Sequence, residues 1–426
     1  MKWASHLEVS YCTNVHPGEG LDALHKIIAQ DLTEVKSRVS PDDSFGTGLR
    51  LGVESVDALS EPHQLHRFCQ ALIERDLYVF SVNGFPYGDF AAPQIKASVY
   101  DPDWAETERA RYTIALAKLM AHLPGPQHRS ISTVAGGFEP ERSGDSSRSQ
   151  TDRMRAFTHN FGAVAQALYE LEEETGVSVR IALEPEPWTS LERVEQVGPF
   201  FERYVWPSSP HAQRYWGLCY DTCHQALAFE DPHDSWETLI NAQVPIFKVQ
   251  VSNALRLLTP RVPEARARLL SFAEPRYLHQ VTGLGPEGDL LRVLDLPKLQ
   301  DPPDSWLASR EWRCHFHVPI WWVGGAETLT SQPLTMTSTS STGLSPTQET
   351  EGLTTTRDFW EGIVELIRSP DAQRHTSPET PLHVEVETYS WGVLPASLRQ
   401  GRTLSDDIVA ELDTLRAHLL PRSLKR

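Results

Sequence analysis

Short apolar runs alternate with longer amphipathic segments along almost the whole of this chain, and that rhythm limits the folds open to it. The apolar runs cover residues 7–14, 47–53, 77–83, 129–134, 179–183, 216–220, 245–251, 312–320 and 381–386. Between them, helical patterns are clearest at 21–36, 63–75, 105–122, 152–175, 191–204, 358–367 and 405–420. Such alternation predicts parallel strands joined by crossover helices, and near-continuous apolar strands are typical of a sheet covered on both faces.

The number of these units and the turn after the first one favour a closed barrel. An open doubly wound sheet would carry a glycine-rich phosphate turn after its first strand, whereas NVHPGE follows here, at residues 14–19. We therefore predict a single-domain (β/α)8 TIM barrel over residues 1–426. Residues 254–311 exceed the length of one crossover helix and predict a helical insertion. Residues 328–356 are rich in Ser and Thr without Lys or Arg, which predicts a mobile loop.

Net charge and cysteine content indicate which binding partners and which cellular compartment to expect. The chain has 39 Lys and Arg against 57 Asp and Glu, a formal net charge of −18. That charge repels a phosphate backbone, and since no local basic patch offsets it, we expect no nucleic-acid partner. Five scattered cysteines form no CxxC pair, and neither an apolar leader nor a membrane-length apolar run is present. We expect a cytoplasmic protein without membrane insertion.

Metal-ligand residue types close several of the predicted strands. Glu184 follows the run 179–183, and Asp221 follows the run 216–220 with His224 three residues later. Because strand ends converge on one face of a barrel, these side chains are expected to meet there. Taken singly, Glu184 could be a salt-bridged rim residue and Asp221 a helix N-cap.

The later strands add ligand types in alternating positions. Lys248 and Gln250 share one face of their strand, and the strand at the end of the chain carries Glu385 and Glu387 in the same way. The segment HFHVP places two imidazoles two residues apart, at His315 and His317, so we expect it to reach the active face. Carboxylates with one or two imidazoles suit Mn²⁺, Mg²⁺, Zn²⁺ or Co²⁺. We predict one such divalent ion, with the completion of its ligand set open between Gln250 and the two histidines, and between Glu385 and Glu387.

Three motifs resemble the xylose isomerase-like barrel superfamily, which includes sugar phosphate isomerases and epimerases. They are LEP at 183–185, GLCYDTCH at 217–224 and VETY at 386–389. The resemblance implies that Glu184, Asp221 and Glu387 bind the metal and that His224 contacts the substrate. It places Gln250 where a histidine ligand usually stands, and His315 or His317 could substitute for it.

A closer resemblance, spread over nearly the whole chain, is to the EboE family of metabolite-traffic proteins. It is carried by motifs such as YCTNVHPGE, YVFSVNGFPYGDF and HVEVETYSWGVLP. The resemblance implies a place in a bacterial pathway that processes or exports a secondary metabolite, with other proteins of that pathway as partners. It implies the fold more directly than the reaction.

Together these features predict a metal-dependent isomerase or epimerase acting on a hydroxylated small metabolite. The metal would polarise a carbonyl, Glu184 or Glu387 would move the proton, and His224 would bind a hydroxyl or shuttle a proton. We take four further polar or aromatic residues as candidate substrate contacts: His16, Asn83, Lys248 and Trp188. Two alternatives remain, a metal-dependent phosphoester hydrolase and a non-catalytic metabolite-binding protein.

Overall fold

Eight parallel strands close into a barrel in the computed structural model, which describes residues 1–4, 6–139, 150–324, 352–369, 380–399 and 401–420. The strands are β2 (Leu7–Tyr11), β3 (Phe45–Arg50), β4 (Leu77–Asn83), β5 (His128–Val134), β6 (Ser178–Glu184), β7 (Trp216–Asp221), β8 (Ile246–Val251) and β14 (Leu382–Val386). Their order is β2-β14-β8-β7-β6-β5-β4-β3, with β1 (Lys2–Ala4) antiparallel to β2. A parallel bridge between Cys12 and Gly48 joins the two ends and closes the barrel.

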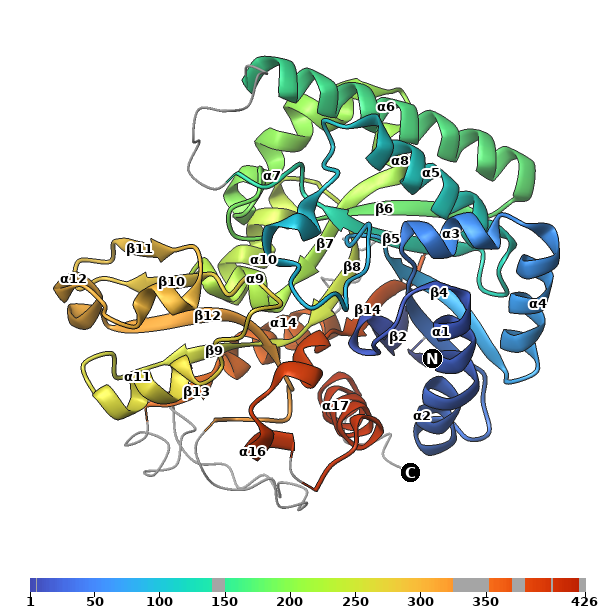
Figure 1. Cartoon of the computed structure of the whole chain (residues 1–426). Helices are drawn as coiled ribbons and strands as arrows, with labels where there is room; N and C mark the ends of the chain where they lie inside the picture. Colours follow the sequence, from blue (N-terminus) through green and yellow to red (C-terminus); the bar gives the residue numbers. More distant parts are fainter. Residues whose placement is uncertain (5, 140–149, 325–351, 370–379, 400, 421–426) are drawn as a thin grey trace.

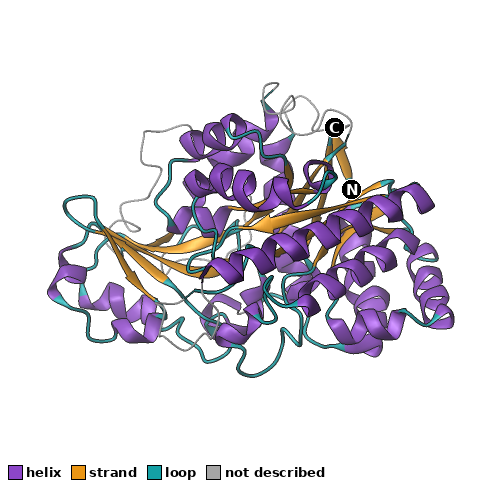
Figure 2. Cartoon of the chain, turned by 90° about the horizontal axis from the view of Figure 1, so that it is seen from above, coloured by secondary structure: helices purple, strands orange, loops and turns teal. Residues whose placement is uncertain are grey.

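Helices surround these strands, as Figure 1 and the view from above in Figure 2 show. They are α1 (Gly20–Lys26), α2 (Thr33–Val39), α3 (Val53–Leu59), α4 (Pro62–Ile73), α5 (Thr107–His122), α6 (Gln150–Thr175), α7 (Val194–Phe200), α8 (Ala212–Tyr215), α9 (Thr222–Leu227), α10 (Pro232–Asn241), α14 (Arg357–Arg368), α16 (Ala396–Arg399) and α17 (Leu404–Leu419). The main apolar core lies between the outer faces of the strands and the inner faces of these helices, because every second strand residue points outward. The predicted barrel is therefore confirmed.

The barrel interior is polar at its N-terminal end. His383 Nδ1 lies 2.7 Å from Ser130 Oγ, and Lys248 Nζ lies 3.2 Å from Ser132 Oγ. The strands β14 and β8 are not neighbours of β5 in the sheet, so both contacts cross the interior. Lys248 also forms a fully buried ion pair with Glu385, with 2.8 Å between Nζ and Oε2. We call Ser130, Ser132, Lys248, His383 and Glu385 the barrel floor.

The insertion predicted over 254–311 is present, but its framework is a sheet rather than helices. Five strands pair in the order β11-β10-β12-β9-β13 and project to one side of the barrel (Figure 1). They are β9 (Asn253–Leu257), β10 (Val281–Leu284), β11 (Leu290–Val293), β12 (Glu311–Val318) and β13 (Leu353–Thr355), joined by the short helices α11 (Pro263–Leu270) and α12 (Asp304–Ala308). This insertion sheet has an apolar core of its own, which includes Leu257, Trp312 and Phe316.

The strand predicted at 312–320 belongs to this second sheet. It forms most of β12, whose register against β9 shifts between Cys314 and Val318. Most of the loop predicted at 328–356 lies outside the described residues, and its end forms β13, which pairs with β9. None of the described helices has both the length and the apolar character needed to span a membrane.

Candidate metal centre

Three carboxylates converge at the C-terminal ends of the barrel strands. Glu184 is the last residue of β6, Asp221 the last of β7, and Glu387 directly follows β14. One oxygen of each lies within 4.8 Å of the other two, and all three side chains are buried. Strand geometry therefore brings together the carboxylates that the sequence predicted as metal ligands.

Asp221 serves two purposes with its two oxygens. Its Oδ1 accepts hydrogen bonds from the backbone nitrogens of Cys223 and His224, at 2.7 and 3.0 Å, and so caps helix α9. Its Oδ2 is buried without a hydrogen-bond partner among the described residues. The N-cap alternative is thus correct, and it still leaves one oxygen for a cation.

Glu387 is held by two amides from other strand ends. Asn14 and Asn83 each donate an Nδ2 hydrogen bond to Glu387 Oε1, at 2.8 and 2.7 Å. Glu184, by contrast, has a buried Oε2 without a hydrogen-bond partner in the described part of the chain. Glu387 is consequently fixed in orientation, whereas Glu184 is the less constrained carboxylate.

The electrostatics of this cluster favour a bound cation. Burial and the neighbouring carboxylates raise the pKa of Glu184 and of Glu387 well above the usual range, and burial raises the pKa of Asp221. Buried like charges are costly unless they are neutralised by protons or by a cation. The unpartnered oxygens and the all-oxygen donor set fit a divalent ion such as Mg²⁺, Mn²⁺ or Zn²⁺.

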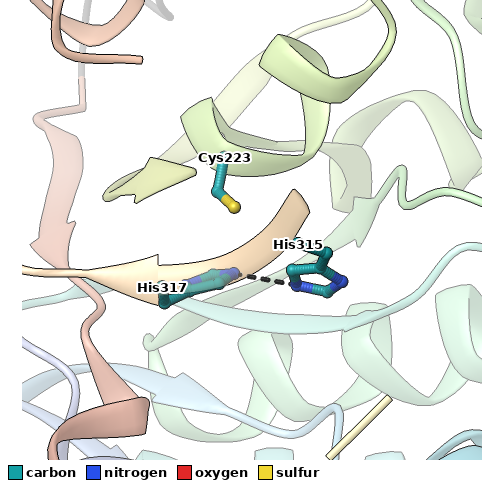
Figure 3. Close-up of side chains that lie close together, drawn as sticks. All are labelled: Cys223, His315 and His317. Atoms are coloured by element: carbon teal, nitrogen blue, oxygen red, sulfur yellow. Dashed lines mark hydrogen bonds between the residues drawn. The ribbon is translucent and has the colours of Figure 1, made fainter. Parts of the chain in front are cut away.

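A second group of ligand atoms lies beside the carboxylates. His224, from α9, and His315 and His317, from β12, point their Nε2 atoms toward one another, and Figure 3 shows the latter two with Cys223. As the sequence predicted, the HFHVP segment reaches the active face. Burial lowers the pKa of His224 to about 3 and that of His317 to about 4, so these imidazoles are neutral at pH 7.

Glu184 and Glu387 of the carboxylate group and all three histidines line one cavity. Its polar lining also includes Asn14, Asn83 and Glu186. Its apolar lining includes Phe85, Phe90, Tyr100, Tyr277 and Tyr389. A cavity in which polar groups converge between aromatic walls is typical of small-molecule sites.

Other predicted site residues lie elsewhere. Lys248 and Glu385 pair with each other in the barrel floor, below the cavity lining. His16 lies 2.9 Å from Tyr11 Oη through its Nε2. The Trp188 ring stacks under the guanidinium of Arg292, at 4.1 Å. Lys248, His16 and Trp188 are not among the residues that line the cavity.

Gln250, the predicted replacement for a histidine ligand, is turned toward the neighbouring strand. Its Oε1 accepts a hydrogen bond from Cys219 Sγ at 2.8 Å. The histidines nearest the carboxylates are instead His224 and His317, whose ligand nitrogens lie within 4.8 Å of an Asp221 oxygen. The imidazole nitrogens nearest the carboxylates therefore come from α9 and from the insertion rather than from β8.

Three residues near the site were not predicted. Asn14 and Glu186 both follow a barrel strand, so the strand-end rule could have identified them. Glu186 accepts a hydrogen bond from Tyr100 Oη at 2.5 Å, and burial raises its pKa to about 8. Gln280, which contacts His315 Nδ1 through its Oε1 at 2.7 Å, comes from the insertion, and no local sequence signal marks it.

Neither a known family model nor a curated protein matches this chain significantly. Among solved structures, the 3-keto-D-glucoside 4-epimerase YcjR from E. coli is similar, at 12% identity over 58% of this chain and 79% of that one, with a TM-score of 0.38. A xylose isomerase domain-containing protein from Salmonella typhimurium LT2 is similar at 11% identity over 98% and 100% of the two chains, with a TM-score of 0.38. The IOLI protein with a binding zinc atom is similar at 10% identity over 58% and 73%, with a TM-score of 0.37. Likenesses at this level concern the barrel architecture alone.

Proposed function

We propose that this protein is a divalent-metal-dependent isomerase or epimerase that moves a proton on a hydroxylated, uncharged small metabolite. The observation that carries the proposal is the buried triad of Glu184, Asp221 and Glu387, of which Glu184 and Glu387 line a cavity with aromatic walls. Such a triad at strand ends, with two unpartnered oxygens, is suited to hold a cation against a substrate oxygen.

The residues of the triad have separable roles. A divalent cation bound there would polarise a substrate carbonyl and raise the acidity of the neighbouring C–H. Asp221 and Glu387 are fixed by the α9 cap and by two asparagine amides, so they act as oriented ligands. Glu184 Oε2 is free of such bonds, which makes Glu184 the carboxylate best placed to take up and return the proton.

The cavity lining favours an uncharged polyol over a phosphoester. Lys96 is the cationic side chain of the lining, and its Nζ already donates to the carbonyl oxygens of Glu274 and Tyr277 and to Asp295 Oδ2, at 3.3, 2.7 and 2.7 Å. A phosphate would therefore find no uncommitted cationic side chain in the described lining. Aromatic rings, by contrast, suit the apolar faces of a sugar ring.

Proton transfer can be tested without knowledge of the natural substrate. The protein, loaded with Mn²⁺, Co²⁺ or Zn²⁺, is incubated in D₂O with a panel of ketoses such as D-fructose, D-xylulose and dihydroxyacetone. We expect deuterium to enter the carbon next to the carbonyl, detected by mass spectrometry. Compared at equal bound metal, Glu184→Gln should reduce that rate by about 10²–10⁴-fold, the usual contribution of a positioned acid–base group.

A half-buried carboxylate outside the cavity lining provides the control. Glu230→Gln removes a similar charge near α7 and should leave the exchange rate unchanged. If the folded, metal-loaded protein binds a polyol but exchanges no proton in any member of the panel, the protein is a metabolite carrier instead. Membership in the EboE family, and with it a role in a secondary-metabolite pathway, remains a prediction from the sequence motifs.

A further inference from the structure

We propose that His224, His315 and His317 form a second cation site, distinct from the carboxylate triad and suited to Zn²⁺ or Co²⁺. Their Nε2 atoms lie 3.2, 3.1 and 3.4 Å apart in the three pairs. A tetrahedral zinc ion with Zn–N bonds of 2.0–2.1 Å requires its nitrogen ligands to be about 3.3 Å apart. The three nitrogens are therefore already spaced as the ligands of one ion.

The orientation of the rings agrees with that arrangement. The rings of His315 and His317 are inclined at 46°, and that of His224 makes angles of 82° with His315 and 65° with His317. Two of the three pairs are edge to face, which aromatic packing alone can also produce. The feature that points to an ion is therefore the close approach of the three Nε2 atoms.

Hydrogen bonds at the opposite nitrogens determine which tautomer each histidine adopts. The Nδ1 atoms of His224, His315 and His317 face Pro185 O, Gln280 Oε1 and Glu387 O, at 3.2, 2.7 and 2.8 Å. These oxygens can only accept, so each Nδ1 carries the proton and each Nε2 presents a lone pair. The Tyr389 hydroxyl lies 3.4 Å from His315 Nε2 and can donate to that lone pair. The lone pairs of His224 and His317 still face each other, and a cation between the three nitrogens would relieve their repulsion.

The acceptor role of Gln280 is itself fixed by its surroundings. Its Nε2 donates to Tyr100 Oη at 3.0 Å, and that hydroxyl donates in turn to Glu186 Oε1 at 2.5 Å. Rotating the amide would place its oxygen against the carbonyl of Pro187, which lies 3.4 Å from Nε2. Histidines whose distal nitrogen is held in this way are typical of metal ligands.

Buried carboxylates lie beside the three histidines. Four of them, Glu184, Glu186, Asp221 and Glu387, are buried near the two candidate sites, and those that ionise favour a cation there. Asp221 has an oxygen within 4.8 Å of the other two carboxylates of the triad and an oxygen within 4.8 Å of the ligand nitrogens of His224 and His317, so it adjoins both sites.

Ligand chemistry indicates which ions each site prefers. Imidazole nitrogens suit Zn²⁺ and Co²⁺, and Cys223 Sγ lies within 4.8 Å of the ligand nitrogens of His315 and His317 (Figure 3). The carboxylate triad offers only oxygen and accepts harder ions. All three histidines line the cavity, so the fourth ligand of an ion could be Cys223 Sγ or a water or substrate oxygen from the cavity.

Co²⁺ binding distinguishes the two sites in the full-length protein. Chelator-stripped protein is dialysed against Co²⁺, the bound metal is counted by elemental analysis, and the visible spectrum is recorded. Co²⁺ in a nitrogen-rich site of low coordination absorbs more strongly than Co²⁺ surrounded by six oxygens. We expect two equivalents in the natural protein, and one equivalent without the strong band in His315→Gln.

Matched variants identify the origin of each equivalent. Glu184→Gln should weaken the other equivalent and keep the strong band. His279→Gln replaces a buried histidine of the same insertion whose nitrogens face His315 O and Glu274 Oε1, at 3.0 and 2.8 Å, so it should behave as the natural protein does. A single equivalent in the natural protein, or an unchanged band in His315→Gln, would overturn the proposal.

A crystallographic measurement covers the case in which His315→Gln does not fold. Crystals of the natural protein soaked in Zn²⁺ should give an anomalous peak between the three Nε2 atoms, beside a peak at the carboxylates. Density at the carboxylates alone would refute the second site. Metal counting does not depend on proton exchange. The second cation site can therefore be refuted while the proposed reaction is supported, and the proposed reaction can be refuted while the second site is supported.

Discussion

The ion pair in the barrel floor offers a stability test that also separates structural from ligand-binding roles. Lys248 and Glu385 are both fully buried, with 2.8 Å between Nζ and Oε2. Although burial opposes the charged form, the adjacent Glu385 carboxylate raises the pKa of Lys248 above its usual range. At this separation the attraction is about 6 kcal/mol for an effective dielectric constant of 20, and it offsets much of the desolvation cost.

Lys248→Met removes one partner and leaves the Glu385 charge buried alone. We expect the free energy of unfolding to fall by about 3–5 kcal/mol, the usual cost of breaking a buried pair from one side. The double variant Lys248→Met with Glu385→Gln leaves no unpaired charge, so it should recover more than half of that loss. Urea unfolding followed by circular dichroism, with a chelator present, measures both values.

Two outcomes would refute this reasoning. A loss below about 1 kcal/mol in Lys248→Met would mean that the pair is not desolvated as the structure places it. The single variant Glu385→Gln completes the comparison. If the double variant loses as much free energy of unfolding as Lys248→Met and Glu385→Gln lose together, the two residues do not interact. Because Lys248 lies below the cavity lining, the double variant should also retain the metal content of the natural protein.

Three further predictions follow from the same structure. Removing divalent ions should lower the thermal midpoint more at pH 8 than at pH 5.5, measured by scanning fluorimetry, because protons compete with the cation for carboxylates whose pKa is raised. Gly48→Ala should cost about 1–3 kcal/mol in urea unfolding, since the added methyl group would collide with the Glu385 carboxylate. Burial raises the pKa of Glu230 from 4.5 to about 7, so between these values the folded state holds a proton that the unfolded state has released. The free energy of unfolding should therefore fall as pH rises through this window, by at most about 3 kcal/mol, and Glu230→Gln should lack that fall.

The barrel and its carboxylates could be predicted because the controlling signals are local. An apolar run such as residues 179–183, followed directly by Glu184, predicts both the strand and the carboxylate at its C-terminal end. The parallel arrangement then brings Glu184, Asp221 and Glu387 to one end without further information. Alternation also placed Lys248 and Gln250 on the inner face, but it does not predict how far along the barrel axis a side chain lies. We therefore predicted Lys248 as a substrate contact, whereas it pairs with Glu385 in the barrel floor.

The sheet framework of the insertion could not be predicted because its strands are short and depend on distant partners. VTGL at 281–284 and LLRV at 290–293 are each four residues long, too short to show alternation. They are strands because β10 pairs with both β11 and β12 over matched registers. The role of Gln280 has the same origin, since its contact with His315 spans two segments that only the sheet brings together.

The division of ligands between the two parts of the molecule explains why the insertion reaches the barrel mouth at all. The barrel brings its carboxylates together from its own strand ends, but Gln250 on β8 accepts a hydrogen bond from Cys219 on the neighbouring strand and β8 brings no imidazole to the group. Strand β12 supplies His315 and His317 at the point where its register against β9 shifts, and such irregularities turn side chains away from their regular direction. His224 meets them because Asp221 caps the helix that carries it. The candidate oxygen ligands thus belong to the barrel and two of the candidate nitrogen ligands to the insertion, so an ion held by the histidines would join the insertion to the barrel.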